Sequence, residues 1–254
     1  MKDNTTIWFL HGAFGMAVDW RFHTKIMAAA GYATRAVDLW RFHNCQSLTL
    51  QETAAALNAE VAACEGRHII VGYSMGGRIA LHAILDKKSP WFGGVVISAH
   101  PGLADEEEKR KRRESDAEWS LRCLHTPWDE LLEQWSAQDV LRGKKENGWG
   151  DRRNLESRKG PVARSFVQWS LGMQDDLRED LAGNHMPLLW LTGENDQKFS
   201  TLANKTCANL PAIQHEVFPD CGHRLPWENV EGFCHRLIRF CDETLGLTSP
   251  QGNL

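Results

Sequence analysis

One eight-residue stretch constrains the fold of this chain more than any other: VGYSMGGR, residues 71–78. An apolar run beginning at His68 leads into it, and a helix-prone run rich in Ala, Ile and Leu follows it. Glycines stand two residues before and two residues after Ser74, as a sharp strand-to-helix turn with little room for side chains requires. Because glycines flank serines in many turns, this pattern alone is weak evidence for a reactive serine. Its interpretation depends on the rest of the chain.

Short apolar runs alternate with helix-prone runs on both sides of that turn. We expect strands at residues 6–12, 33–40, 68–74, 93–100, 187–196 and 213–223. The first four runs are short and rich in Val, Ile, Leu or Trp, as expected for strands buried on both faces. Helices are expected at residues 50–64, 76–87 and 228–245. This alternation predicts βαβ units and an α/β fold with a mostly parallel central sheet and helices on both faces.

The middle of the chain has a different pattern, because no strand-like run occurs between Asp105 and Leu181 and the charge density rises. Helices are expected there at residues 104–124, 127–141 and 161–177, with the polar stretch 142–151 as a separator. We therefore predict two units. Residues 1–103 and 182–254 form a core, and residues 104–181 form an inserted helical cap.

Composition excludes several classes of protein. With 254 residues and 42% hydrophobic side chains, the chain can bury a substantial core. The net charge of -4 argues against nucleic acid as a partner. No apolar run reaches 18 residues, and the run at the N-terminus covers only Ile7 to Leu10, so we expect no membrane insertion and a cytoplasmic location. The seven cysteines contain no C-x-x-C pair, so neither a disulfide scaffold nor a structural metal site is expected.

A serine hydroxyl becomes reactive when a carboxylate-oriented imidazole lies next to it, and candidates for both follow downstream. LTGENDQKF ends a strand and offers Glu194 and Asp196; we prefer Asp196, which reaches further beyond the strand end. His223 lies in the loop after the next strand. The order Ser74, Asp196, His223 is that of an α/β-hydrolase triad. The alternative reading of His223 is an ordinary loop histidine.

The first expected strand ends in FLHGAFG, which suggests a further part of the same site. His11-Gly12 would bring the Ala13 amide close to Ser74, where it could form an oxyanion hole with the Met75 amide. An ordinary glycine turn is the alternative explanation.

Basic residues near the serine point to an anionic small substrate. Arg78 lies one helical turn after Ser74, and Lys198 follows the acid motif. The basic run at 109–113 is different, because the four acids at 105–108 precede the bases at 109–112 by four residues each. Such spacing predicts an exposed, ion-paired helix face, with Arg113 left outside the pairing. For each cation a plain surface role remains the alternative.

Four segments together resemble one family: VGYSMGGR, SAHPGL with the basic helix after it, LTGENDQKF, and CGH. These resemble the 2-succinyl-6-hydroxy-2,4-cyclohexadiene-1-carboxylate (SHCHC) synthases of menaquinone biosynthesis, the MenH family of the α/β-hydrolase superfamily. The similarity extends from the first strand to the last helix. It implies an α/β-hydrolase fold with a helical cap and a lyase activity without a metal or organic cofactor. The reaction implied is elimination of pyruvate from 2-succinyl-5-enolpyruvyl-6-hydroxy-3-cyclohexene-1-carboxylate.

Carried onto this sequence, the resemblance assigns the triad to Ser74, Asp196 and His223. It implies that a polycarboxylated substrate contacts six further side chains, namely Tyr73, Arg78, Arg112, Trp135, Arg158 and Lys198. The alignment of Arg158 crosses a stretch of uncertain length. The family pattern selects Arg112, whereas the pairing argument selected Arg113, and we follow the family pattern. The other tryptophans of the helical region, Trp119, Trp128 and Trp169, are expected to pack within the cap.

The chain departs from the family at one turn. Many relatives have D-L-P-G-H-G after the second strand, where this chain has DLWRFHNCQS. Asp38 and Leu39 remain, but bulky or basic residues replace the proline and both glycines. Arg41 or His43 could contact an anionic substrate here, or could equally be packed or solvated.

Two other functions stay open at this stage. A carboxylesterase or carbon–carbon bond hydrolase would use the same three residues through nucleophilic attack by Ser74. A non-enzymatic binding protein could have kept the fold, although the complete set of three residues argues against it. A monomer or a weak homo-oligomer is expected.

Overall fold

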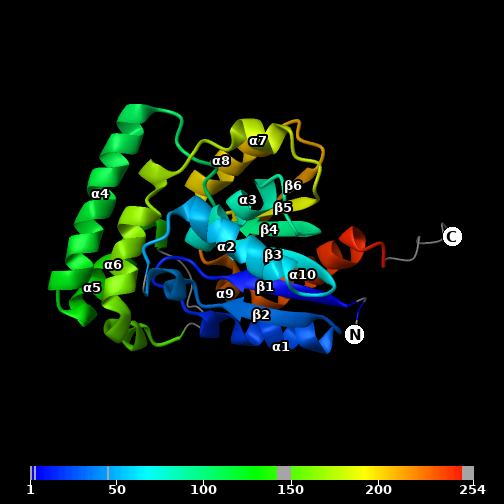
Figure 1. Cartoon of the computed structure of the whole chain (residues 1–254), viewed down its shortest axis with the longest axis horizontal. Coiled ribbons are helices and arrows are strands. Elements are labelled where there is room, and N and C mark those ends of the chain that lie inside the picture. Colours follow the sequence, from blue (N-terminus) through cyan, green and yellow to red (C-terminus); the bar gives the residue numbers. More distant parts are fainter. Residues whose placement is uncertain (1, 3, 45, 142–149, 248–254) are drawn as a thin grey trace.

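The computed structural model of the chain describes residues 2, 4–44, 46–141 and 150–247. Six parallel strands form one sheet in the order β2-β1-β3-β4-β5-β6 (Figure 1). The strands are β1 (Thr5–Leu10), β2 (Ala33–Val37), β3 (Arg67–Tyr73), β4 (Gly93–Ile97), β5 (Leu188–Gly193) and β6 (Ile213–Phe218). The predicted strands and the parallel sheet are confirmed. All six strands end before the predicted limit, so that Ser74, Asp196 and His223 lie beyond the ends of β3, β5 and β6.

The four central strands β1, β3, β4 and β5 are buried on both faces, as their apolar runs predicted, whereas the edge strands β2 and β6 are only partly buried. In β1, Ile7 and Phe9 point into one core layer while Trp8 and Leu10 point into the other, and all four are fully buried. Helices α1 (Arg21–Ala29) and α10 (Val230–Thr244) cover the first layer. Helices α2 (Leu50–Ala62), α3 (Met75–Leu85) and α8 (Gln197–Cys207) cover the second.

Two of these helices, α1 and α8, were not predicted from the sequence. Helix α1 buries only His23 and Met27, so its apolar stripe is too narrow to stand out in a single sequence. Helix α8 begins directly after Asp196, whose side chain accepts a hydrogen bond from the Phe199 amide at 3.4 Å. A carboxylate at this position caps the helix and satisfies one of its free amides. The candidate triad acid is thus also a helix cap.

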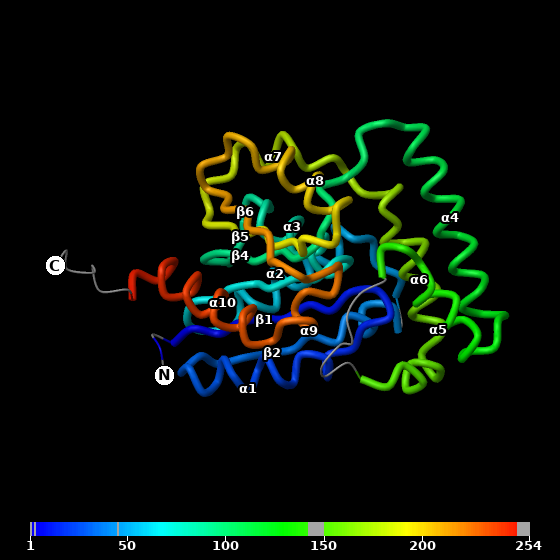
Figure 2. Tube along the Cα trace, turned by 180° about the vertical axis from the view of Figure 1, so that it is seen from behind, coloured from blue at the N-terminus to red at the C-terminus, as the bar shows by residue number. Residues whose placement is uncertain are grey.

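Between β4 and β5 the described residues form helices and irregular segments. The main helices are α4 (Glu106–His125), α5 (Trp128–Ser136) and α6 (Lys159–Gln168), which lie together to one side of the sheet in both views (Figures 1 and 2). The short helix α7 (Arg178–Ala182) leads back to β5. This arrangement fits the predicted cap at 104–181, while the exact domain limits stay a prediction. Of the predicted separator at 142–151, residues 142–149 lie outside the described residues.

Two local predictions in this segment were wrong. The helix expected at 161–177 ends at Gln168, because Ser170, with a ψ of 139°, leaves the helical conformation and its side chain accepts a hydrogen bond from the Gly172 amide. On α4 the ion pairs mostly join other partners than predicted. Arg110 pairs with Glu107 and with Glu114, and only the Glu107–Lys111 pair of the four expected ones is present among the described residues. A long basic side chain on an exposed helix can pair with an acid three or four residues away on either side, with similar free energy. Sequence spacing alone therefore does not predict which acid it pairs with.

Within the part of the chain that the structure describes, no helix combines the length and the apolar character needed to span a membrane.

Candidate active site

Ser74 lies at the tip of the turn between β3 and α3, in a backbone conformation that few non-glycine residues adopt. Its φ of 53° is in the left-handed region, and its amide donates to the Ile97 carbonyl at 2.8 Å. A Cβ on Gly72 would lie 2.4 Å from the Gly76 carbonyl oxygen, and a Cβ on Gly76 would lie 2.5 Å from the His11 carbonyl oxygen. Both glycines are therefore required by close backbone approach, and this packing holds the strained serine at the sheet edge.

His223 connects this serine to Asp196. Its Nε2 lies 3.1 Å from Ser74 Oγ, and its Nδ1 lies 2.6 Å from Asp196 Oδ2. Both His223 and Asp196 are only 5% exposed, so the connection is shielded from water. Glu194, the alternative acid, instead accepts a hydrogen bond from the Asp220 amide at 3.0 Å. The structure thus joins the three predicted residues in the geometry that serine activation needs.

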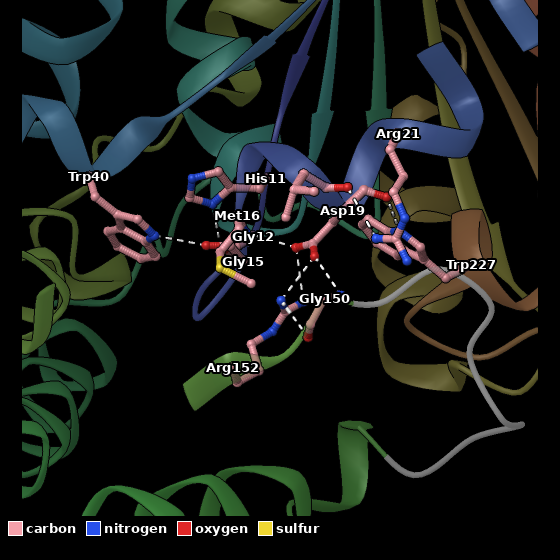
Figure 3. Close-up of polar contacts among 11 residues, drawn as sticks. His11, Gly12, Gly15, Met16, Asp19, Arg21, Trp40, Gly150, Arg152 and Trp227 are labelled. Carbon is pink, nitrogen blue, oxygen red and sulfur yellow. Dashed lines mark hydrogen bonds and ion pairs between the residues drawn. The ribbon is translucent and has the colours of Figure 1, made fainter. Parts of the chain in front are cut away.

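The loop after β1 is fixed by a buried histidine. His11 is fully buried, and its Nδ1 lies 2.9 Å from the Gly12 carbonyl oxygen while the Leu39 amide donates to its Nε2 at 3.1 Å. Burial lowers the pKa of His11 to about 4, so the ring is neutral and Nδ1 carries its single proton. The side chain of Trp40 donates to the Gly15 carbonyl at 2.8 Å (Figure 3). These contacts hold the loop that leads past Ser74.

Ala13 and Met75, the two predicted oxyanion-hole residues, both line the cavity that contains Ser74. Met75 is the first residue of α3. The first amides of a helix have no acceptor within the helix, so they point out of its N-terminal end and favour negative charge there. Ala13 belongs to the loop that His11 fixes. Their stabilisation of an oxyanion is a proposal that this placement supports.

A cavity of about 270 Å³ opens above Ser74, between the sheet edge and helices α4, α5 and α6. Four cationic side chains are part of its wall, namely Arg78, Arg112, Lys198 and Arg224. Arg78 is 9% exposed; it donates to the Trp169 carbonyl at 2.6 Å and to Gln174 Oε1 at 3.1 Å. Burial and the neighbouring charge of Arg112 lower the pKa of Arg78 to about 9. Arg78 still carries its charge at neutral pH. An anion bound beside it would stabilise that charge and so offset the effects of burial and of Arg112 on its pKa.

The family pattern selected Arg112 as a substrate contact, whereas the pairing argument selected Arg113, and the structure places these two side chains differently. Arg112 lines the cavity, and its Nε donates to Asp116 Oδ2 at 2.9 Å. Arg113 points elsewhere and donates to the Gly172 carbonyl at 2.8 Å. The position selected by the family pattern is therefore the one that faces the site.

Two basic residues of the wall, His100 and Arg224, were missed by the sequence analysis. His100 lines the cavity, and its Nδ1 accepts a hydrogen bond from the Gly102 amide at 3.0 Å. Burial, followed by the nearby charges of Arg78 and other cations, lowers the pKa of His100 to about 3, so the proton of the neutral ring is on Nε2. Its signal in the sequence was its place at the end of the strand expected at 93–100. Arg224 follows His223 directly and gave no signal of its own.

Aromatic side chains close the rest of the cavity. Trp135, Trp119 and Trp169 all line it, so the latter two contribute to its wall as well as to cap packing. The Trp135 ring lies 4.8 Å from that of Phe14 and 5.0 Å from that of Trp119. Tyr73 also lines the cavity, with its ring 5.5 Å from the His223 ring. Trp128 is buried in the cap, as expected.

Arg158 is the predicted substrate contact that the structure does not bring to the cavity. Its Nη1 lies 2.6 Å from Asp38 Oδ2, and it is not among the described residues that line the cavity. The sequence placed Arg158 by an alignment across a stretch of uncertain length. Its charge is instead used to join the cap segment to the loop after β2.

The unusual turn DLWRFHNCQS does not reach the cavity with its basic side chains. Arg41 pairs with Glu60 on α2. His43 is fully buried, with its ring 4.2 Å from that of Trp169, and burial lowers its pKa to about 4. Arg164 of α6 donates to the His43 carbonyl at 3.0 Å. The bulky residues that replace the glycine-rich turn therefore pack beneath α6.

In the described residues, no cluster of three or more His, Cys, Asp or Glu side chains is arranged to share a metal ion.

The chain matches the model of the alpha/beta hydrolase family over residues 9–236, and it belongs to that family. It is 30% identical over 237 residues to the 2-succinyl-6-hydroxy-2,4-cyclohexadiene-1-carboxylate synthase of Escherichia coli O1:K1 / APEC, which covers 88% of each protein. The synthase of Enterobacter sp. (strain 638) is 34% identical over 162 residues, which cover 63% of this chain and 61% of that protein. Within the alpha/beta hydrolases, the chain belongs to the family of these synthases.

Solved structures agree on the fold. The structure of MenH from S. aureus superposes with a TM-score of 0.87 at 21% identity and covers 96% of both chains. A thermophilic esterase from Thermogutta terrifontis gives a TM-score of 0.73 at 17% identity, over 95% of this chain and 91% of that one. At such identities the similarity shows a shared fold and nothing about the reaction.

Proposed function

We propose that this chain is a carbon–oxygen lyase that removes pyruvate from 2-succinyl-5-enolpyruvyl-6-hydroxy-3-cyclohexene-1-carboxylate and releases SHCHC, a step of menaquinone biosynthesis. One observation carries the proposal. The hydrogen-bonded series Ser74–His223–Asp196 opens into a small cavity whose wall includes four cations. The relatives named as synthases of SHCHC support the same activity.

The charge of the cavity fits the proposed substrate. The succinyl group, the enolpyruvyl group and the ring each carry one carboxylate. Arg78, Arg112 and Lys198 come from α3, α4 and α8, so they approach the cavity from different sides. Guanidinium groups bind carboxylates strongly in a shielded site, often through two parallel hydrogen bonds. Several separate carboxylates can thus be held at once, and this fixes the ring relative to Ser74.

The mechanism uses Ser74 as a base. His223, oriented by Asp196, accepts the Ser74 hydroxyl proton, and Ser74 Oγ takes the ring proton next to the succinyl carbonyl. The electron pair moves into that carbonyl, where the Ala13 and Met75 amides stabilise the negative charge. Its return across the ring double bond expels enolpyruvate, which takes the proton held by His223, so one C–H bond and one C–O bond break. The ring becomes a 2,4-diene, and the released enol becomes pyruvate.

The decisive experiment measures pyruvate release from this substrate, generated in place because it decays. We expect release far above the spontaneous rate, and a loss of at least about 1000-fold in Ser74→Ala with an unchanged thermal unfolding midpoint. Wild-type turnover in folded Ser74→Ala would refute the role of the serine.

The competing function, a serine hydrolase for a small carboxylated substrate, predicts another result. It requires fast hydrolysis of p-nitrophenyl esters and no acceleration of pyruvate release. The two reactions use the same three residues, so substrate choice separates them, not mutation of the serine. The cytoplasmic location and a monomeric or weakly associating state remain predictions of the sequence.

A further inference from the structure

Asp19, in the short turn of 3-10 helix Ala17–Trp20 before α1, is a buried carboxylate with four hydrogen-bond donors around it. It is fully buried, and Arg152 of the cap segment, 9% exposed, binds it with both terminal nitrogens. The distances are 2.9 Å from Nη1 to Oδ1 and 2.8 Å from Nη2 to Oδ2. This two-point contact between a guanidinium and a carboxylate fixes direction as well as distance.

The other two donors to Asp19 are backbone amides from separate parts of the chain. Met16, at the end of the loop that carries Ala13, donates to Oδ2 at 2.7 Å, and Gly150 of the cap segment donates to Oδ1 at 3.0 Å. Figure 3 shows the carboxylate beside the loop of Gly12, Gly15 and Met16, with Arg152 and Gly150 below it. A Cβ on Gly150 would lie 2.8 Å from Met16 Cε, so the two segments are in direct contact.

Asp19 and Arg152 also contact the segment that follows His223 and helix α5 of the cap. The Asp19 carbonyl accepts from the Trp227 side chain at 3.0 Å, four residues after His223. The Arg152 carbonyl accepts from the side chain of Trp128 at 2.9 Å, on α5, the helix that carries Trp135. Through their side chains and backbone carbonyls together, Asp19 and Arg152 therefore contact the loop of Ala13, the segment after His223 and helix α5 of the cap.

We propose that Asp19 and Arg152 are positioning residues, whose ion pair sets the place of the Ala13 amide relative to Ser74 and ties it to a seated cap. This inference rests on the proposed oxyanion role of Ala13. Taking both charges out of water offsets much of their attraction, so a buried pair is a weak stabiliser. Its four directed hydrogen bonds do define a geometry. A misplacement of about 1 Å in a reacting site costs roughly 100-fold in rate.

The test uses p-nitrophenyl diethyl phosphate, a small neutral probe that does not need the cationic wall. Ser74 Oγ forms a bond to phosphorus, p-nitrophenolate leaves, and His223 takes the hydroxyl proton; the phosphoryl oxygen occupies the oxyanion hole. We expect Arg152→Lys, which keeps the charge but not the two-point contact, to lower the second-order rate of labelling about 10- to 100-fold. In pyruvate release, kcat should fall by a similar factor while KM changes less than about 3-fold.

Arg153→Lys is the matched control, because Arg153 is the next residue and pairs with Asp151 at the surface. It should leave both rates unchanged. The double variant Asp19→Asn/Arg152→Gln removes both buried charges, so its unfolding midpoint should lie above that of Asp19→Asn, yet labelling should stay slow. Wild-type labelling in folded Arg152→Lys, or labelling that simply follows the unfolding midpoint across the variants, would overturn the proposal. If the wild type releases no pyruvate but labelling shows the expected pattern, the proposed lyase fails and the positioning role stands.

Discussion

The sheet and the helical segment between β4 and β5 each supply part of one cavity, but they are built from different interactions. On the sheet side, backbone approaches as close as those of Gly72 and Gly76 place Ser74. On the helical side, long side chains such as Arg112 reach the cavity from an otherwise exposed helix. Backbone packing cannot absorb one added methyl group, whereas an exposed helix can lose most of its charges without effect. Sensitivity to mutation should therefore differ sharply between the two parts.

The largest effect is expected from Gly76→Ala, because the added methyl would meet the carbonyl oxygens of His11 and Leu10 at 2.5 and 2.6 Å. We expect a loss of about 3 kcal/mol in the free energy of unfolding, measured by urea titration, together with the loss of activity. Gly160→Ala is the control in the cap, where the nearest atom is a flexible Arg164 nitrogen at 3.6 Å. There the same change should be neutral or should stabilise by about 0.5 kcal/mol. Equal effects at the two glycines would contradict the comparison.

Arg78→Met tests the buried cation that joins the two parts. Arg78 lies on α3 of the core, but its guanidinium binds the Trp169 carbonyl and Gln174 after α6. Removing it leaves those acceptors and a substrate carboxylate without a partner, so kcat/KM for pyruvate release should fall about 100- to 1000-fold. Labelling by the neutral phosphate probe should change far less. A similar loss in both assays would mean that Arg78 maintains the structure of the site and does not bind the substrate.

Acid should destabilise the core through its sealed histidines. Burial lowers the pKa of His11, His23 and His43 from 6.5 to about 4, and all three are fully buried. Because the folded pKa lies below the unfolded one, the unfolded chain binds more protons between these values. Stability is therefore lost as the pH falls from about 6.5 towards 4. Near pH 5 the unfolded chain binds roughly one proton more per histidine than the folded chain does. Urea unfolding from pH 7 to 4.5 gives this slope.

A single variant can check the source of that slope. Neither ring nitrogen of His43 has a hydrogen-bond partner among the described residues. His43→Leu should therefore reduce the pH slope by about one proton without a large loss of stability at pH 7. An unchanged slope would assign the acid sensitivity to other groups.

The smallest effect is expected on α4. Arg110 is half-exposed and pairs with Glu107 and Glu114. Arg110→Ala should move the unfolding midpoint by less than about 2 °C and leave pyruvate release unchanged, because exposed pairs are screened by water and salt. A large change in either quantity would show that this helix face is more than a solvated surface.

The strands and the order of the candidate triad could be predicted because they are written in local patterns. The runs before Ser74 and Asp196 are almost continuously apolar, the run before His223 is shorter and mixed, and each candidate follows the end of its run. Parallel strands bring their carboxyl ends to one edge, so the separate candidates converge there. The narrow stripe of α1, by contrast, left no such pattern.

The partners of the charged side chains could not be predicted in this way. Arg152 finds Asp19 from 133 residues away, and Arg158 finds Asp38 from 120 residues away. Nothing in the local sequence distinguishes these two arginines from Arg153, which pairs with Asp151 two residues before it. The choice depends on which carboxylate the fold brings into reach and on how well the pair is shielded.

The sequence by itself determined the class of fold, the serine turn and the residues that could activate the serine, because strand periodicity and glycine sterics act over a few residues. Tertiary structure alone decided that His100 faces the cavity, that Arg158 does not, and that Asp19 joins the loop of Ala13 to the cap. The physical reason is that charge–charge contacts act across space and depend on burial, which only the folded chain defines.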